Sequence, residues 1–555
     1  MEVAGEELQS ANLDHHGLVA AVCQELGIAE KINAALGPGD PQRVVSAGTS
    51  VVAMILNGLG FTNRRLYLTH QFFENKPIEK LLGQALQAKS ITDHTLGQTL
   101  DEIAEYGTSE LFGKVAFAVA LEHNLLSRHN HLDTTSLSVH GEYERSENTP
   151  WINLTHGYSK DHRPDLKQAV LSLVVNGPSE LPLWMDALDG NSSDKKSFHQ
   201  TIERVRAFQA QIALEQPFKW IADSALYSKD HLLGHNDTRW LCRVPETLSE
   251  AKALVSRPTE AIDWASHPQG YRSACYESSY GGIEQRWVLV YSEQAYQREK
   301  KTLEKKLHQQ QAQLAKQLWH VQNETFQCEA DARLALKPLA KRYRYFSLAV
   351  EVEPIERYAN KGRPRAGAQK AVVGYRLVGE AKRDEAAIEQ ALNAKGRFIL
   401  ATNDLDTTDY PDQCLLQEYK AQQSAERGFR FLKDPWFMVD SIFLKSPQRI
   451  EALMMVMTLC LLVYNFAQYR LRQTLKDEHE TIPNQLDQPV QNPTLRWIFQ
   501  LLEGISIVRL CGEMTQGVVK EFVTNLTDLR QKIIRFFGDT ACQMYGLIPK
   551  NAAKA

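Results

Sequence analysis

The first 125 residues carry apolar side chains at helical spacing. Two stretches show the pattern clearly, LVAAVCQELGIAEKINAAL (residues 18–36) and TSVVAMILNGLGF (residues 49–61), with Gly and Pro at the breaks. Apolar groups that recur every three or four residues predict amphipathic helices. We interpret residues 1–125 as a helical region for DNA binding or dimerisation. Arg64 and Arg65, which follow a Gly-rich turn, would suit a helix-turn-helix, and a plain helical hairpin explains the same pattern.

Between residues 126 and 246 the pattern changes to short β-rich runs. Examples are HNHLDTTSLSVHG (129–141), LKQAVLSLVVNG (166–177) and KWIADSA (219–225), and a helical stretch, Phe198–Ile212, separates the last run from the others. Several strands, then a helix, then another strand predict an α/β fold. Residues 126–246 are therefore expected to form the first part of an α/β core.

Residues 247–395 break this rhythm and are predicted to be an α+β insertion. Apolar positions from Tyr296 to Val321 are spaced by threes and fours through a Lys-, Gln- and Glu-rich helix, which predicts a helical hairpin arm or a short coiled coil over Ser292–Gln322. The following residues alternate like a β-hairpin, and the hairpin loop carries Lys361, Arg363 and Arg365. Such a loop is either a solvated turn or a phosphate-binding loop, and the pattern supports both equally. Residues 396–446 then resume the core.

The remainder, residues 447–555, is predicted to be a helical C-terminal region. Its apolar run over residues 452–467 has charged neighbours and is shorter than the 18 or so residues of a spanning helix, which predicts a buried core helix rather than a membrane span. The acidic N-terminus resembles no secretory signal. The eight Cys include no C-x-x-C pair, which favours a reducing compartment, the cytoplasm. A net charge of -4 gives no overall basic field, so any nucleic-acid contact must come from local patches.

The most informative stretch is YKAQQSAERGFRFLKDP, residues 419–435. It spaces Tyr419, Gln422, Glu426 and Lys433 by three, four and seven residues, which places all four side chains on one face of a single predicted helix. One carboxylate is thereby flanked by groups that bind phosphate.

Two further acids lie at strand-like positions far upstream. Asp133 sits within a β-rich run, and Asp223 directly follows the apolar Trp-Ile-Ala. Three acids from three separated segments suit a phosphoryl-transfer site, in which two divalent ions activate the nucleophile and stabilise the leaving oxygen. Carboxylates are the ligands that hold Mg²⁺ or Mn²⁺. Asp133, Asp223 and Glu426 are the candidate ligands.

Other kinds of active site fit less well. A paired-carboxylate glycosidase does not require a Lys and a Tyr on the helix of its Glu. The chain has no G-x-S-x-G nucleophile elbow and no P-loop. His140, His156 and His162 are not accompanied by the usual Cys/His spacing of zinc sites.

Taken in order, the motifs resemble those of DDE-type transposases of bacterial insertion sequences. The matching segments are LNGLGF, ITDHTLGQTLD, LDTTSLS, HGYSKDHRPDLKQAVLSLVV, DGNSSD, WIADSALYS, TNDLD, the stretch that begins at Tyr419, and NPTLRWIF. The resemblance implies an RNase H-like catalytic core of the retroviral integrase superfamily, with a Y-R-E-K signature around the catalytic Glu. Gln422 stands where the signature has Arg, and a neutral amide cannot make the bidentate phosphate contact of Arg.

The resemblance also implies roles for individual residues. Asp133, Asp223 and Glu426 become the catalytic triad that binds two Mg²⁺ or Mn²⁺ ions. The implied DNA contacts come from Tyr419, Gln422, Arg430 and Lys433, together with the loop residues Lys361, Arg363 and Arg365.

The implied reaction is metal-dependent cleavage at insertion-sequence ends followed by strand transfer. Its partners would be double-stranded DNA, as terminal inverted repeats and as target, and a second copy of the chain in a homodimer. The enzyme would act in the bacterial cytoplasm at the nucleoid, without a membrane. Two alternatives remain: an RNase H-like nuclease that cuts without joining, and an inactive DNA-binding relative. A helical scaffold built on the 292–322 helix would explain none of the three acids.

Overall fold

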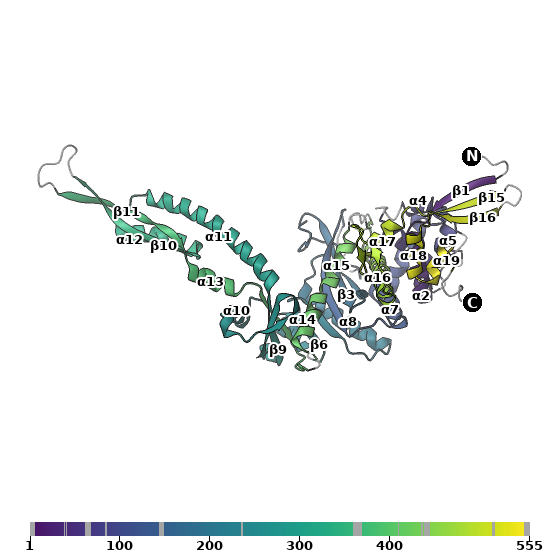
Figure 1. The fold of residues 1–555 in the computed structure, drawn as a ribbon, viewed down its shortest axis with the longest axis horizontal. Helices are drawn as coiled ribbons and strands as arrows, with labels where there is room; N and C mark the ends of the chain where they lie inside the picture. Colours follow the sequence, from purple (N-terminus) through teal and green to yellow (C-terminus); the bar gives the residue numbers. More distant parts are fainter. Residues whose placement is uncertain are drawn as a thin grey trace. The chain divides into compact units, whose positions relative to one another are not determined.

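The structure, a computed structural model, consists of two compact units (Figure 1). Unit 1 comprises Met1–Leu241 and Gln417–Ala555, and unit 2 comprises Cys242–Leu416. The structure describes residues 6–37, 39, 42–61, 68–83, 86–143, 149–234, 237–358, 369–408, 410–434, 437, 444–512 and 517–548. The predicted loop residues Lys361, Arg363 and Arg365 lie outside the described residues, as do Arg64 and Arg65 of the possible helix-turn-helix.

Unit 1 contains a mixed sheet that confirms the predicted α/β class. Its strands lie in the order β4-β3-β2-β5, with β2 at His129–Val139, β3 at Lys167–Asn176, β4 at Leu181–Leu188 and β5 at Lys219–Ala222. β3 pairs with both β2 and β4 in antiparallel fashion, whereas β5 runs parallel to β2. All residues of β3 after Lys167 are buried, which requires that both faces of the sheet be covered.

Two helices cover opposite faces of this sheet. α8 (Asp194–Gln211) packs on β2, β3 and β4, and the Ser172 hydroxyl of β3 lies 3.1 Å from the Thr201 hydroxyl of α8. α15 (Gln423–Leu432) packs on β2 and β3, where its Gly428 lies against Leu173. Because successive strand residues point to opposite faces, contacts to Ser172 and Leu173 place the two helices on opposite sides.

The long apolar helix is α16 (Pro447–Asp477), and it lies in the core of unit 1. It packs against α3, α6, α7 and β4. By length and hydropathy it could cross a membrane, yet 94% of its most apolar 18-residue window is buried inside the protein. This burial confirms the prediction of a core helix.

The other helices of unit 1 come mainly from the two ends of the chain. They are α1 (His16–Glu25), α2 (Ile28–Leu36), α3 (Ala47–Leu59), α4 (Thr69–Phe73), α5 (Ile78–Leu82), α6 (Asp93–Tyr106), α7 (Thr108–Glu122), α9 (Lys229–Gly234), α17 (Leu495–Leu501), α18 (Asp528–Phe536) and α19 (Asp539–Met544). Their arrangement confirms that residues 1–125 are mostly helical.

The prediction of helical regions at the two ends did not include a small sheet, and it is wrong there. β1 (Glu6–Asn12), β15 (Ser506–Gly512) and β16 (Gly517–Thr524) pair antiparallel in the order β1-β15-β16. The apolar run after Pro493 stops being helical because Gly504 adopts a left-handed φ of +84°, and the β-branched residues that follow extend as β15. A short pair, β13 (Ile482–Pro483) and β14 (Pro489–Val490), lies in the same region.

Unit 2 carries an antiparallel sheet in the order β12-β9-β8-β7. The strands are β7 (Ala265–His267), β8 (Tyr271–Ser278), β9 (Gln285–Ser292) and β12 (Arg397–Thr402), and β6 (Arg239–Arg243) spans the boundary between the units. The short helices α10 (Ser249–Val255) and α13 (Glu385–Asn393) also belong to this unit. Because β12 pairs with β9, unit 2 extends beyond the segment predicted as the insertion.

The remaining part of unit 2, which we call the arm, matches the predicted helix and hairpin. Its elements are α11 (Glu293–Gln322), α12 (Glu329–Arg342), β10 (Phe346–Tyr358) and β11 (Lys370–Arg383), and α11 and α12 lie beside the paired strands (Figure 1). The Ser292 hydroxyl caps α11 by accepting the Ala295 N–H. The predicted seam is buried against α12 and the hairpin, which confirms both elements.

Candidate active site

The parallel pairing of β2 and β5 brings Asp133 and Asp223 together. His129, Asn130 and His131 pair with Lys219, Trp220 and Ile221, a constant offset. If the same offset continues for two residues, Asp223 lies beside Asp133 just past the end of β5, which agrees with the effect of the Asp223 charge on Asp133. Local N–H groups hold both carboxylates: Asp133 Oδ1 accepts from Thr134 at 2.8 Å, and Asp223 Oδ1 accepts from Ala225 at 2.8 Å.

Two residues that the sequence did not single out complete this cluster. Asp194, in the first turn of α8, accepts a hydrogen bond from the Thr134 hydroxyl at 2.5 Å. Lys160 places its Nζ 3.4 Å from Asp194 Oδ2 and 3.9 Å from Asp133 Oδ1, and it donates to the Thr134 carbonyl at 2.6 Å. We call Asp133, Asp223, Asp194 and Lys160 the acidic cluster. Lys160 therefore pairs with two of the three carboxylates, and its charge also acts on the third, Asp223.

The electrostatics of the acidic cluster favour a bound cation. Burial raises the pKa of Asp133 to about 6, and the negative charges of Asp223 and Asp194 add to this rise, while Lys160 and the Thr134 N–H oppose it. Burial likewise raises the pKa of Asp223, and Asp194 adds to the effect. Both shifts mean that the folded chain resists full ionisation of the cluster. A divalent cation would remove that resistance, and carboxylates are the donors it prefers.

Glu426 lies on α15, on the face of the sheet to which Asp133 points. Asp133 pairs with Leu173 across the antiparallel ladder, so both side chains point to the face that α15 covers. Gly428 allows α15 to approach α16 closely, since an added Cβ would lie 3.0 Å from the Leu461 side chain. The Glu426 side chain is exposed.

Gln422 ties the start of α15 to β2. It is buried, donates its amide to the Leu132 carbonyl at 3.0 Å and places its amide oxygen 3.3 Å from Nδ1 of His131. The predicted single helix over residues 419–433 is wrong at this point: α14 (Asp412–Ala421) ends and α15 begins there. The Gln422 N–H bonds the Tyr419 carbonyl three residues back, which interrupts the regular four-residue pattern.

The other predicted DNA-binding residues lie along the same two helices. Tyr419 is half-buried in α14, and Arg430 is exposed in the last turn of α15. Lys433 follows the end of α15 and forms an ion pair with Asp161 at 2.6 Å.

The acidic cluster thus unites two of the three predicted metal ligands. Within the described ranges, no three His, Cys, Asp or Glu side chains are arranged as a complete metal site, so Glu426 is not gathered with the two Asp residues. Asp194 and Lys160 were missed as functional candidates because they come from segments outside the β2 and β5 pattern. The motifs DGNSSD and HGYSKD, which contain them, were the available signal.

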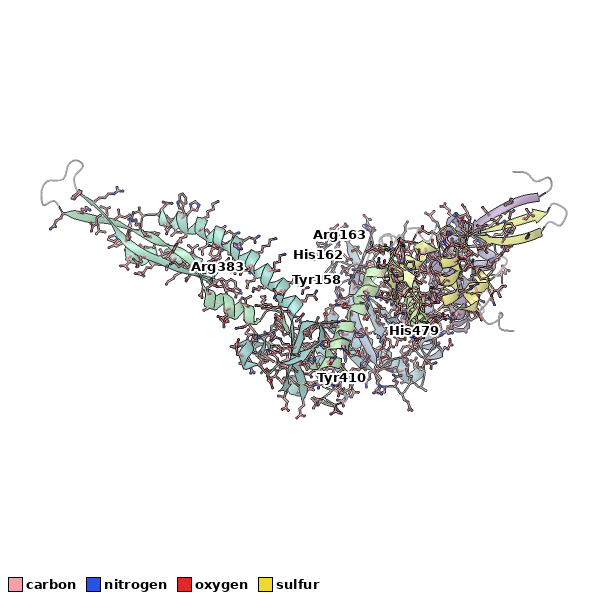
Figure 2. The ribbon with its side chains drawn as sticks, viewed as in Figure 1. Tyr158, His162, Arg163, Arg383, Tyr410 and His479 are labelled. Carbon is pink, nitrogen blue, oxygen red and sulfur yellow. The ribbon has the colours of Figure 1, made fainter. Side chains whose placement is uncertain are left out.

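The segment that carries Lys160 presents several polar groups at the surface of unit 1. Tyr158 is 84% exposed, and His162 and Arg163 lie near it (Figure 2). Arg163 is paired with Asp165 at 2.7 Å. His140, His156 and His162 are all exposed.

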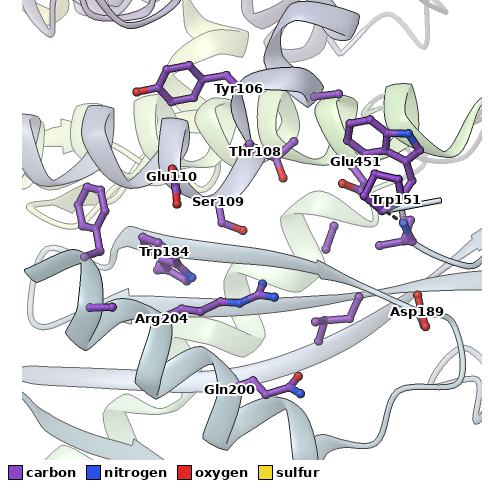
Figure 3. A pocket seen from close by; sticks show the side chains of 18 of the residues that line it. Tyr106, Thr108, Ser109, Glu110, Trp151, Trp184, Asp189, Gln200, Arg204 and Glu451 are labelled. Carbon is purple, nitrogen blue, oxygen red and sulfur yellow. Dashed lines mark hydrogen bonds between the residues drawn. The ribbon is translucent and has the colours of Figure 1, made fainter. Parts of the chain in front are cut away.

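A separate cavity of about 660 Å³ lies beside β4 (Figure 3). Residues of α7, β4 and α8 line it, together with Trp151 and Glu451, and none of the three predicted metal ligands does. Burial raises the pKa of Glu451 to about 7, although its carboxylate accepts the Ile152 N–H. This cavity is not part of the acidic cluster.

Comparison with protein families identifies the chain. A model described as "Transposase DDE domain" matches residues 126–464, and a domain of unknown function, DUF4277, matches residues 8–117. The chain belongs to the DDE transposase family. It is a DNA transposase, an enzyme that cleaves and transfers DNA strands. DDE transposases generally use divalent metal ions, which agrees with the carboxylate-rich cluster of this transposase.

Solved structures of other transposases show only distant similarity to this DDE transposase. The piggyBac transposase synaptic complex with hairpin DNA is 8% identical, with a TM-score of 0.35, and the match covers 90% of this chain and 82% of that chain. The Mos1 transposase paired-end complex with left transposon end is 11% identical, with a TM-score of 0.14, covering 37% and 59%. No curated protein matches the chain. The α/β sheet of unit 1 is consistent with the RNase H-like fold expected of the family.

Proposed function

We propose that Asp133, Asp223 and Glu426 hold two Mg²⁺ or Mn²⁺ ions and that this site cuts the ends of an insertion sequence and joins them to target DNA. The observation that carries the proposal is the register of β2 and β5, which sets Asp133 and Asp223 side by side on the sheet face covered by the helix of Glu426. Glu426 joins them by turning its exposed side chain toward the pair. Bound divalent ions would polarise the phosphate and lower the pKa of the attacking water.

The chain's own residues then have distinct tasks. The Thr134 and Ala225 N–H groups fix the orientation of the two Asp carboxylates. Gln422 positions α15 through the Leu132 carbonyl, so we assign it a positioning role in place of the predicted DNA contact. Tyr419, Arg430 and Lys433 remain the proposed contacts to phosphates near the cut, and the loop residues Lys361, Arg363 and Arg365 remain proposed DNA contacts.

The proposed substrates are the terminal inverted repeats of the element and a target duplex. Two ends must be paired for joining, so we propose a homodimer in the DNA complex. The reaction takes place in the bacterial cytoplasm, at the nucleoid.

The test is cleavage and joining of duplexes that carry the inverted repeats flanking the coding region. We expect Asp223→Asn and Glu426→Gln each to lower Mg²⁺-dependent cutting at least about 1,000-fold, since each removes a metal-binding charge. Glu389→Gln, at an exposed position of α13, is the matched control and should cut normally. Undiminished cutting in both triad variants would refute the triad, and cutting without joining would identify a nuclease.

A further inference from the structure

One face of α11 in the arm is strongly basic. The other face is the buried seam, formed by Leu303, Leu307, Leu314 and Leu318 and packed into the core of the arm. Opposite this seam, exposed positions recur at intervals of three and four, which places them in a line along the helix. They are Arg298, Lys301, Lys305, Gln309, Ala312 and Lys316. We call this line the basic stripe.

The basic stripe lacks acidic partners. Beyond its first turn, α11 has two acids, Glu299 and Glu304, which lie off the line and pair with Lys395 and Arg383 from other elements of unit 2. Among the described residues, no acidic group lies within ion-pair distance of the Arg or the three Lys of the stripe. Their charge is therefore available to an external anion.

The dimensions of the stripe suit a nucleic-acid backbone. The 18 residues between Arg298 and Lys316 span about 27 Å at 1.5 Å per residue. That length corresponds to about eight base pairs at 3.4 Å each. A helix that is held against its own core presents these cations with little loss of order on binding.

The composition of the stripe argues against a protein partner. Protein interfaces are depleted in Lys and rely on apolar anchors at their centre. Here the line is made of Lys, Arg and Gln with a single small Ala, and the one large apolar group near it is Trp319 at the C-terminal end, 61% exposed. A single aromatic at the end of a cationic line does not supply the central apolar cluster of a packed protein interface.

We propose that the basic stripe binds the phosphate backbone of duplex DNA without regard to sequence. This proposal rests on the proposed function for its substrate and adds a DNA contact outside the acidic cluster. Phosphate contacts fix the position of a protein on a duplex and carry no sequence information directly. The stripe would thus hold DNA while the acidic cluster acts on it.

The test compares two pairs of lysines in the full-length protein. K301Q/K305Q removes two charges of the stripe, and K337Q/K341Q removes two exposed charges at the same spacing on α12. Binding to a random-sequence 30-base-pair duplex is measured by fluorescence anisotropy over a range of salt concentrations. We expect K301Q/K305Q to bind about tenfold more weakly at 0.1 M salt and to lower the slope of log K against log salt by about 1.8, since each lost phosphate contact lowers it by about 0.9. K337Q/K341Q should match the unsubstituted protein.

The outcomes separate this proposal from the proposed function. Equal affinity and slope in the two double variants would overturn the stripe, whatever the triad variants show. A loss of self-association in K301Q/K305Q, measured by sedimentation with DNA binding unchanged, would overturn it in favour of an interface between copies. Normal cutting by both Asp223→Asn and Glu426→Gln would refute the triad and leave the binding result intact. Unchanged circular dichroism excludes misfolding as the cause of weaker binding.

Discussion

Two places on the sheet of unit 1 hold carboxylates that are wholly or partly buried, and they are built in opposite ways. On β4, Asp186 accepts hydrogen bonds from the hydroxyls of Ser109 at 2.8 Å and Thr201 at 2.7 Å, and it pairs with Arg204 at 3.0 Å. The chain itself thus satisfies this charge.

The acidic cluster on β2 and β5 is not satisfied in the same way. Asp133 accepts one local N–H, has two other carboxylates near it and has one ammonium at 3.9 Å. Asp186 is the more deeply buried of these acids and Asp133 is only half-buried, so burial alone does not mark a functional acid. An excess of negative charge that the chain does not neutralise is the distinguishing feature, and it is what a divalent cation relieves.

Replacing the satisfied acid should have the largest effect on stability. Asp186→Asn removes the charge that Arg204 pairs with and presents an amide to two hydroxyl donors. We expect the free energy of unfolding to fall by about 3 kcal/mol, as when one partner of a buried charged network is lost. Urea unfolding monitored by circular dichroism measures this. Asp165→Asn, at an exposed ion pair, is the control and should leave the urea unfolding curve unchanged. An unchanged unfolding midpoint for Asp186→Asn would show that the two places do not differ in how the chain satisfies their charge.

Glu451 shows what burial alone does to a carboxylate that lies away from the acidic cluster. Its pKa, raised to about 7 by burial, means that the folded protein favours the protonated form. The stability this proton provides is fully present below the ordinary pKa of a Glu and is lost as the pH rises through about 7. Glu451→Gln should therefore raise the free energy of unfolding by about 2 kcal/mol at pH 8 and by nothing at pH 4.

Thermal unfolding at the two pH values, with and without Mg²⁺, checks this expectation. The gain should not depend on Mg²⁺, because Glu451 lies apart from the acidic cluster. The exposed Glu389→Gln is the control at both pH values. A gain of equal size at pH 4 and pH 8 would show that packing, not charge, causes the effect.

The sequence predicted the strand positions of Asp133 and Asp223 because strand patterns and the residues that end them are local features. It did not predict the spatial neighbours of those acids. Asp194 and Lys160 reach the cluster from the start of α8 and from an irregular segment, and only tertiary contacts connect them to β2.

Two errors have similar physical origins. The sequence pattern does not reveal the break at Gln422, because the adjacent Ala421 and Gln423 favour helix. The contact to the Leu132 carbonyl that accompanies the break is tertiary. The strand β15 was predicted as helix because its apolar residues directly continue the run of α17, and its pairing partner β1 lies at the other end of the chain. In both cases long-range contacts decided the structure.

The smallest expected effect concerns the one cation inside the acidic cluster. Lys160 occupies the space between Asp133 and Asp194, so its charge competes with a metal ion for the same carboxylates. Lys160→Met should tighten Mn²⁺ binding by the DNA-free protein about fivefold, equivalent to about 1 kcal/mol and well below the Coulomb energy of an ion pair at this distance in an effective dielectric of about 20. Electron paramagnetic resonance of free Mn²⁺ measures the affinity directly, without any cleavage assay.

Lys195→Met provides the matched control for this measurement, because Lys195 is exposed and adjoins Asp194 in the chain. An equal gain in Mn²⁺ affinity in both variants would show that the effect comes from the loss of any nearby positive charge and not from the position of Lys160. Weaker binding by Lys160→Met would show that its hydrogen bonds to Thr134 hold the cluster in shape and that its charge does not compete. A gain confined to Lys160→Met would show that the Lys160 ammonium group is a weak internal substitute for the metal ion in the acidic cluster. Asp186 differs, because the chain itself satisfies its charge.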